Sequence, residues 1–232
     1  MPGELSGLIP DPTWKRIYQG ENWSTGDTYL ASVGQGYVLA TPLQVLMSAA
    51  TIANNGRLMQ PTVIREIVDG EGNVIQPFTP RLRWDITTDP VIKDYSCVNG
   101  ECTATGKMKT VSNAAVEQVA AGMRLAATDP DGTLNHSFSF LNYPIAIAGK
   151  TGTAEYCDDV ANAKGVCNPG NWPAHGWTMA YAPYENPEIA ILAFFYNAGE
   201  GGRVAAPTVK AVMDAYFTLK AVDTAQGLTG NP

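Results

Sequence analysis

A strand-like segment in the second half of the chain leads into a motif that could do chemistry. Ile145–Ala148 is uniformly apolar, and after Gly149 the segment Lys150–Thr153 reads Lys-Thr-Gly-Thr. One chemistry for Gly-Lys-Thr is phosphate binding, because a P-loop ends in these residues. That motif needs another glycine five positions before Gly149, where this chain has Pro144, and a helix downstream. The P-loop is therefore rejected, and a plain edge strand with a solvated lysine and a glycine bulge remains the alternative to a catalytic strand.

The motif is one of several short sequence blocks that follow one another along the chain. They are Gly26-Asp27-Thr28, Gly34-Gln35-Gly36-Tyr37, Ala40-Thr41-Pro42-Leu43-Gln44, Asn55-Gly56 with Pro61, Gly132-Thr133, Lys150 to Ala154, His175-Gly176-Trp177 and Ala182-Pro183. Together they resemble class B penicillin-binding proteins over roughly residues 2–217. The segment from Leu8 to Lys15 is most similar to the elongation-type branch, penicillin-binding protein 2.

The resemblance implies a fold and an activity. The fold is the C-terminal portion of the penicillin-binding-protein and serine β-lactamase-like fold, an α+β antiparallel sheet packed with helices. The activity is D,D-transpeptidation, which cross-links peptidoglycan stem peptides through a serine acyl-enzyme that β-lactams also form. The implied partners are a stem peptide ending in D-Ala-D-Ala, β-lactams and other cell-wall synthesis proteins. No metal or organic cofactor is implied.

The same resemblance assigns roles to the Lys-Thr-Gly-Thr strand. Lys150 would be the second active-site cation, and Gly152 would let the substrate backbone approach closely. The hydroxyls of Thr151 and Thr153 would bind the substrate carboxylate. The backbone N–H of Thr153 would be one donor of the oxyanion hole.

The nucleophile that this mechanism requires is not in the sequence. The family takes its serine and first lysine from S-x-x-K and a polar bridge from S-x-N, and neither pattern occurs here. Both precede the Gly-Asp-Thr block in the family. We therefore expect the chain to be a C-terminal piece of the domain, inactive in isolation, whose partners include the missing N-terminal portion.

Two other functions are compatible with the sequence. A β-lactamase or β-lactam sensor shares the fold, but the Gly26–Gln44 blocks are more typical of transpeptidases. A non-catalytic binding module that scaffolds cell-wall synthesis proteins is the other alternative.

Three other residues of these blocks have plain structural interpretations. We expect His175 to be buried or to cap a neighbouring segment, and Trp177 to lie in the core. We expect Asp27 to fix the conformation of a loop through bonds from its side chain to the backbone.

The four cysteines form two local pairs. Cys97 and Cys102 lie five positions apart, and Cys157 and Cys167 lie ten apart, which favours two short disulfide loops among the three possible pairings. Four free thiols remain the alternative. Zinc is disfavoured, because no C-x2-C occurs and the only histidines are His136 and His175. Disulfides indicate an oxidising compartment.

Composition narrows the function further. The 232 residues carry 15 basic and 22 acidic side chains, and a net charge of −7 argues against nucleic-acid binding. With 45% hydrophobic residues the chain is a folded protein. No run approaches the roughly 18 apolar residues of a membrane span, and the first residues do not have the pattern expected of a signal peptide. By resemblance, the parent protein has an anchor outside this chain and carries the domain on the extracytoplasmic face of the cell membrane.

Residue patterns predict the elements that position the motif. We expect loop over 1–40, a helix from Thr41 to Asn55, a hairpin over 61–78, and a helix from Ser112 to Ala127. Strands are expected at 145–153, 176–181 and 189–196, and a helix from Pro207. Residues 1–220 are predicted to be a partial transpeptidase domain, with 79–111 as an irregular surface excursion and 221–232 as a flexible tail.

Overall fold

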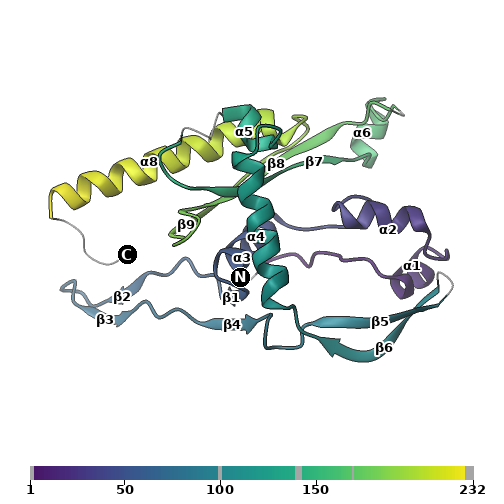
Figure 1. Cartoon of the computed structure of the whole chain (residues 1–232), viewed down its shortest axis with the longest axis horizontal. Coiled ribbons are helices and arrows are strands. Elements are labelled where there is room, and N and C mark those ends of the chain that lie inside the picture. The colour runs from purple at the N-terminus through teal and green to yellow at the C-terminus, as the bar shows by residue number, and fades with distance from the viewer. Residues whose placement is uncertain (1–2, 99–100, 139–142, 169, 228–232) are drawn as a thin grey trace. The chain divides into compact units, whose positions relative to one another are not determined.

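Two compact units make up the chain, Met1–Val119 and Ala120–Pro232. The computed structural model describes residues 3–98, 101–138, 143–168 and 170–227. Both units contain helices and antiparallel strands, so the predicted α+β class is confirmed (Figure 1). Among the described residues, no helix combines the length and apolar character needed to cross a membrane.

Three helices open the first unit. They are α1 (Pro12–Tyr18), α2 (Thr25–Ser32) and α3 (Pro42–Ala53). The predicted start of α3 is confirmed, since the Thr41 and Gln44 side chains form a capping box. The loop predicted over residues 1–40 is wrong. Each of the two helices there is at most eight residues long, too short for a clear apolar period, and begins at a polar cap, Asp11 or Ser24.

Three separate strand pairs complete this unit. The strands are β1 (Arg57–Met59), β2 (Glu66–Val68), β3 (Val74–Pro77), β4 (Leu82–Asp85), β5 (Ile92–Val98) and β6 (Glu101–Lys109). All pair antiparallel, β1 with β4, β2 with β3 and β5 with β6. The β2–β3 and β5–β6 hairpins extend in opposite directions (Figure 1). The predicted hairpin over 61–78 is confirmed.

The irregular conformation predicted for the surface excursion over 79–111 is wrong. This segment holds β4 and the β5–β6 hairpin, in which Cys97 and Cys102 are direct cross-strand partners and form a disulfide. Polar and charged residues interrupt the apolar alternation in β5 and β6, which hid the strands from the sequence pattern. β4 pairs with β1, more than twenty positions earlier, so a local window contains only half of that pairing.

A three-stranded sheet and its helices form the second unit. The strands are β7 (Ala148–Glu155), β8 (Ala174–Ala182) and β9 (Ile189–Phe195), and the helices are α5 (Thr133–Phe138), α6 (Asp159–Ala163), α7 (Gly201–Val204) and α8 (Ala206–Ala225). Helix α4 (Asn113–Thr128) enters this unit at residue 120. The strand order is β7-β8-β9, antiparallel throughout.

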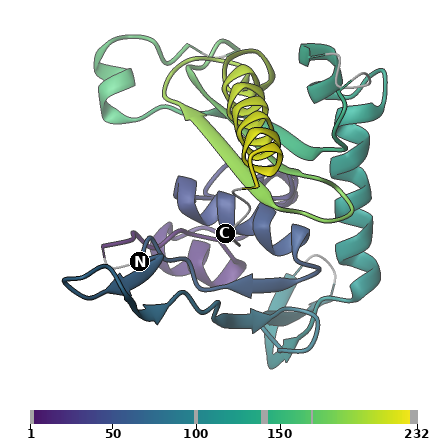
Figure 2. The ribbon, with the colours of Figure 1, turned by 90° about the vertical axis from the view of Figure 1, so that its left-hand side faces the viewer.

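One face of this sheet carries the core. Helix α8 lies along that face (Figure 2) and buries Val209 and Met213 against Ala180 and Ile191. The continuous apolar run in β9 is typical of a strand covered on both faces. Ile191 and Ala193 on the α8 side are buried, whereas Phe194 on the other side is 36% exposed.

The C-terminal helix is longer than the sequence indicated. The tail expected from residue 221 continues α8 to Ala225. Ala221 and Val222 extend the apolar side of the helix that includes Phe217, and no glycine interrupts the chain before Gly227. Residues 228–232 lie outside the described part of the chain.

Candidate functional site

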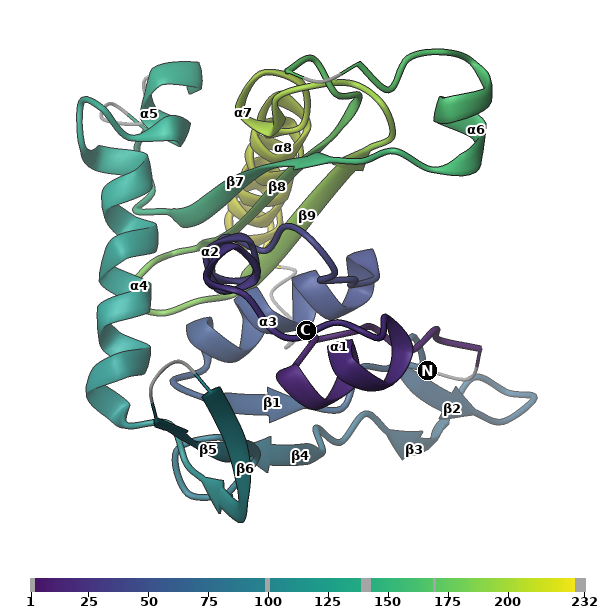
Figure 3. The same cartoon turned by 90° about the vertical axis from the view of Figure 1, so that its right-hand side faces the viewer.

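The Lys-Thr-Gly-Thr motif lies on β7, at the edge of the second unit's sheet (Figure 3). In the described part of the chain β7 is paired with β8 alone, through the register Lys150↔Met179, Thr151↔Thr178 and Thr153↔Gly176. An edge strand keeps one row of backbone N–H and C=O groups available for an extended ligand. The position of the motif therefore suits recognition of a peptide backbone.

Strand alternation divides the motif between two faces. Lys150 and Gly152 share the face opposite α8, whereas Thr151 and Thr153 share the helix-covered face. Lys150 and Thr153 are exposed, while Thr151 is only 8% exposed. The Lys150 ammonium donates a hydrogen bond to the carbonyl oxygen of Thr151. The exposed Lys150 and Thr153 side chains thus lie on opposite faces of the same strand.

Gly152 lies opposite Trp177 in the register. A Cβ added to Gly152 would be 3.3 Å from the Trp177 Cβ, which is tighter than an ordinary side-chain contact. A larger residue at position 152 would push against Trp177 and cover the strand. Because Gly152 has no side chain, the backbone of β7 stays accessible to a ligand at this position.

Thr151 is held by a residue whose role the sequence analysis did not identify. Its hydroxyl forms a 2.8 Å hydrogen bond with the hydroxyl of Thr133, which is the first residue of α5. In the sequence, the Gly132-Thr133 block served only as one of the motifs that indicate the family, and no role was assigned to Thr133. Its appearance in a fixed order before the Lys-Thr-Gly-Thr strand was the one available signal that the two segments meet.

Aromatic rings follow the Lys150 face of the sheet. Trp177 packs on Phe194 with ring centroids 4.3 Å apart, and His175 stacks on Tyr156 at 4.0 Å. Tyr196 lies 4.7 Å from the His175 ring. Trp177 is only partly buried, so it belongs to this row and not to the core expected for it.

His175 has the capping role expected for it. Its Nδ1 accepts a 3.1 Å hydrogen bond from the backbone N–H of Asn197, whose φ is 48°. Burial lowers the pKa of His175 below its usual value, although the nearby Asp158 carboxylate acts in the other direction. A neutral imidazole therefore stabilises the turn after β9.

The loop between β7 and β8 is cross-linked. Cys157 and Cys167 form a disulfide that encloses α6, and Asp158 caps that helix by accepting a hydrogen bond from Ala161 N at 2.7 Å. In the described part of the chain, all four cysteines are in disulfides.

The Gly-Asp-Thr block of the first unit is structural. Asp27 Oδ2 accepts from Lys15 Nζ and from the backbone N–H of Ser24, each at 2.7 Å. The Lys15 ammonium, followed by the Ser24 hydroxyl and N–H, lowers the pKa of Asp27 to about 2. Lys15 itself is 5% exposed, so the pair fixes α1 against α2. Asp27 lies in helix α2 and not in the loop that the sequence indicated, although its bond from the Ser24 N–H is of the expected side-chain-to-backbone kind.

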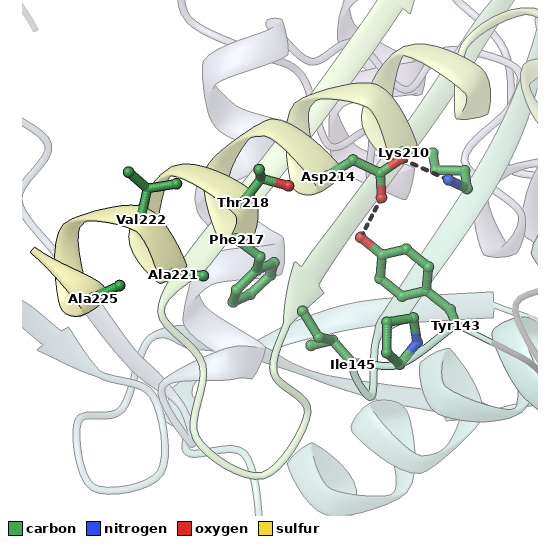
Figure 4. Close-up of a pocket in the computed structure, with 10 residues that line it drawn as sticks. Tyr143, Ile145, Lys210, Asp214, Phe217, Thr218, Ala221, Val222 and Ala225 are labelled. Carbon is green, nitrogen blue, oxygen red and sulfur yellow. Dashed lines mark hydrogen bonds and ion pairs between the residues drawn. The ribbon is translucent and has the colours of Figure 1, made fainter.

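A shallow depression of about 730 Å³ lies elsewhere on the second unit, between α8 and the segment that precedes β7 (Figure 4). Its two charged side chains and its tyrosine pair with one another. Asp214 accepts from Tyr143 Oη at 2.7 Å and from Lys210 Nζ at 2.6 Å. None of the motif residues lines it, so the edge of β7 is the better candidate site.

Comparison with known proteins defines the class to which this fold and this edge strand belong. Residues 1–214 match the penicillin binding protein transpeptidase domain. The chain belongs to this family. It is 34% identical over 222 residues to the peptidoglycan D,D-transpeptidase MrdA of Haemophilus influenzae, covering 94% of this chain and 30% of that protein. It thus spans about a third of the length of this relative.

Solved structures agree with that assignment. Pseudomonas aeruginosa PBP2, in complex with WCK 5153, is 28% identical and has a TM-score of 0.61 over 93% of this chain and 39% of that chain. Helicobacter pylori PBP2, in complex with MreC, is 25% identical with a TM-score of 0.59 over 94% of this chain and 32% of that chain. The expected family, fold and likeness to the PBP2 branch are confirmed.

Proposed function

We propose that residues 1–220 are the C-terminal part of the transpeptidase domain of a peptidoglycan D,D-transpeptidase. The parent enzyme cross-links stem peptides through a serine acyl-enzyme and is acylated by β-lactams. The observation that carries the proposal is the edge strand β7, which presents Lys150 and Thr153 in solvent on either side of Gly152. The relatives named D,D-transpeptidases supply the reaction class.

Each motif residue has a role in that reaction. An extended stem peptide, or a β-lactam in its place, lies along the free edge of β7. Lys150 adds positive potential and hydrogen-bonds toward the polar bridge. Thr151 and Thr153 hydroxyls bind the substrate carboxylate, and the Thr153 N–H donates to the oxyanion of the tetrahedral intermediate. Gly152 leaves room for the substrate backbone.

The nucleophile belongs to a segment outside these 232 residues. No serine here has lysine three positions later, and the S-x-N bridge is also missing from the sequence. We infer that the isolated chain does not form an acyl-enzyme. The proposal needs the N-terminal portion of the same domain as a partner.

Exposed apolar side chains in the first unit support such a partner. Val63 is 84% exposed, Ile64 62% and Ile75 66%, all in or beside the β2–β3 hairpin. A hairpin with this much exposed apolar surface is poorly stable in water and is a typical contact surface. The rest of the domain covers it in this proposal. Other cell-wall proteins are further partners, as MreC is for the Helicobacter pylori protein.

The proposed location is the extracytoplasmic face of the cell membrane, with the anchor outside this chain. Two disulfides, Cys97–Cys102 and Cys157–Cys167, support an oxidising compartment. Labelling of intact cells with a membrane-impermeant reagent tests it: the domain is modified if it lies outside and protected if it lies in the cytoplasm.

The catalytic assignment is tested on the intact protein that contains this chain, by the rate of acylation with benzylpenicillin. Lys150→Ala lowers the rate by about a hundredfold or more, because an electrostatic contact of the transition state is lost. Lys164→Ala, in the loop enclosed by the Cys157–Cys167 disulfide, is the matched control and leaves the rate unchanged. Equal rates for Lys150→Ala and wild type would contradict the proposal.

A further inference from the structure

Thr133 and Thr151 form a pair of hydroxyls at the motif strand. The Thr151 side chain is buried, so its hydroxyl cannot rely on bulk water for a partner. Its hydrogen bond goes to Thr133 Oγ1, 2.8 Å away. Thr133 therefore determines how the Thr151 hydroxyl is oriented when no ligand is present.

The position of Thr133 is fixed by the turn that precedes it. The Gly132 N–H donates to the Asp129 carbonyl at 2.8 Å, and a Cβ on Gly132 would lie 2.5 Å from the Ala126 carbonyl oxygen. Only glycine fits so close to the end of α4. On the other side of Thr133, Leu134 is fully buried in the core. The Thr133 hydroxyl is thus anchored by its neighbours on both sides.

A pair of hydroxyls can form its hydrogen bond in either direction. Each can donate or accept, because the hydroxyl hydrogen rotates. In the unliganded protein the two hydroxyl oxygens lie 2.8 Å apart, a distance that suits a hydrogen bond in either direction. A carboxylate beside the strand accepts hydrogen bonds only, so Thr151 must turn its hydrogen toward it, and its own oxygen is then free to accept from Thr133.

We propose that Thr133 is a positioning residue that acts through Thr151: a bound ligand carboxylate fixes the direction of the hydrogen bond between them, so that Thr133 donates to Thr151 and Thr151 donates to the carboxylate. This inference rests on the proposed function, since it assumes that the ligand is a β-lactam or a stem peptide. This chain of two hydrogen bonds strengthens the contact with the anion, because successive hydrogen bonds polarise one another. Thr153, on the same face two residues later, supplies the second hydroxyl.

The test compares two probes on the intact protein that contains this chain, benzylpenicillin and its methyl ester. The ester has no carboxylate, so the ratio of the two acylation rates measures recognition of the anion. Thr133→Val lowers this ratio by about tenfold, the loss typical of one charge-assisted hydrogen bond. Thr133→Ser keeps the hydroxyl and restores the ratio to within about twofold of wild type.

Thr128→Val is the matched control. Thr128 is five residues earlier, and its hydroxyl donates to the Arg124 carbonyl within α4 at 3.0 Å. The Thr128→Val variant leaves the ratio of the two acylation rates unchanged. A variant that merely loosened the fold would slow both probes equally. A wild-type ratio in Thr133→Val overturns the inference alone, whereas a wild-type protein that benzylpenicillin does not acylate overturns the proposed function and the inference together.

Discussion

The Thr178 hydroxyl donates a 3.0 Å hydrogen bond to the carbonyl oxygen of Gly201 in the interior of the second unit. Thr178 is fully buried and is the cross-strand partner of Thr151. The bond ties the start of α7 to the middle of β8, directly beside the motif strand. It is therefore part of the scaffold that holds β7 in place.

Thr178→Val is expected to destabilise the second unit. Valine has the same shape but leaves the Gly201 carbonyl without its donor, which lowers the free energy of unfolding by about 1–3 kcal/mol. Denaturant unfolding measures the change. Thr218→Val, on the exposed side of α8, is the control and should stay within about 0.5 kcal/mol of wild type. Equal stabilities for the two variants would show that the buried bond contributes nothing.

The pair of Lys15 and Asp27 predicts acid sensitivity of the first unit. The pKa of Asp27 is about 2 in the folded protein, below the usual value of 3.8. Because the folded pKa is depressed, the unfolded chain takes up the proton first, and stability falls as the pH drops from about 4 toward 2. NMR titration of the Asp27 carboxyl measures its pKa directly.

Variants separate the two acidic partners of Lys15. Lys15→Met removes the ammonium and should raise the pKa of Asp27 toward 3.8. Glu21→Gln is the control, since Glu21 is 64% exposed and lies 3.2 Å from the Lys15 ammonium. It should change the pKa of Asp27 little. An unchanged Asp27 pKa in Lys15→Met would show that the ion pair does not form.

His175 predicts a second pH effect, at milder acidity. Burial depresses its pKa, so the unfolded chain binds the proton more readily and stability decreases as the pH falls below about 6.5. Protonation of Nδ1 also ends the hydrogen bond from Asn197 N–H. His175→Gln should abolish this part of the pH dependence of unfolding. A wild-type profile that is flat between pH 7 and 5.5 would contradict the prediction.

Cross-linking of the β7–β8 loop predicts a measurable stabilisation. The Cys157–Cys167 disulfide closes a loop with a sequence separation of 10. Replacing both cysteines by serine is expected to lower the free energy of unfolding by about 3 kcal/mol, mainly through the entropy of the unfolded chain. The pair Cys97 and Cys102, with a separation of 5, is the comparison and should contribute about 2 kcal/mol. A larger effect from the shorter loop would contradict this account.

Local patterns predicted the elements that carry their own boundary signals. Helix α3 was recognisable from the Thr41–Gln44 capping box, and the β2–β3 hairpin from the turn that begins at Asp69. The β1–β4 pairing depends on residues far apart in the sequence, and no local period reveals it. Helices α1 and α2 were missed because they are short and flanked by glycines.

In the candidate site too, local sequence predicts some features, whereas others depend on contacts between distant segments. The motif on β7 was visible as a string of residue types, and its family order gave it meaning. That Thr151 is buried and bonded to Thr133 follows from strand alternation combined with the position of α5, which packing determines. The fixed order of the two blocks was the only sequence signal for this contact, and it did not show which atoms meet.

Intact-mass measurement after incubation with benzylpenicillin tests the central claim most directly, followed by peptide mapping of any adduct. For the intact protein that contains this chain, we expect one penicilloyl group on a serine outside these 232 residues. For the 232-residue chain itself, we expect no adduct. A penicilloyl group on any serine within the chain would contradict the placement of the nucleophile, and an intact protein without an adduct would contradict the assignment of β7 to a transpeptidase site.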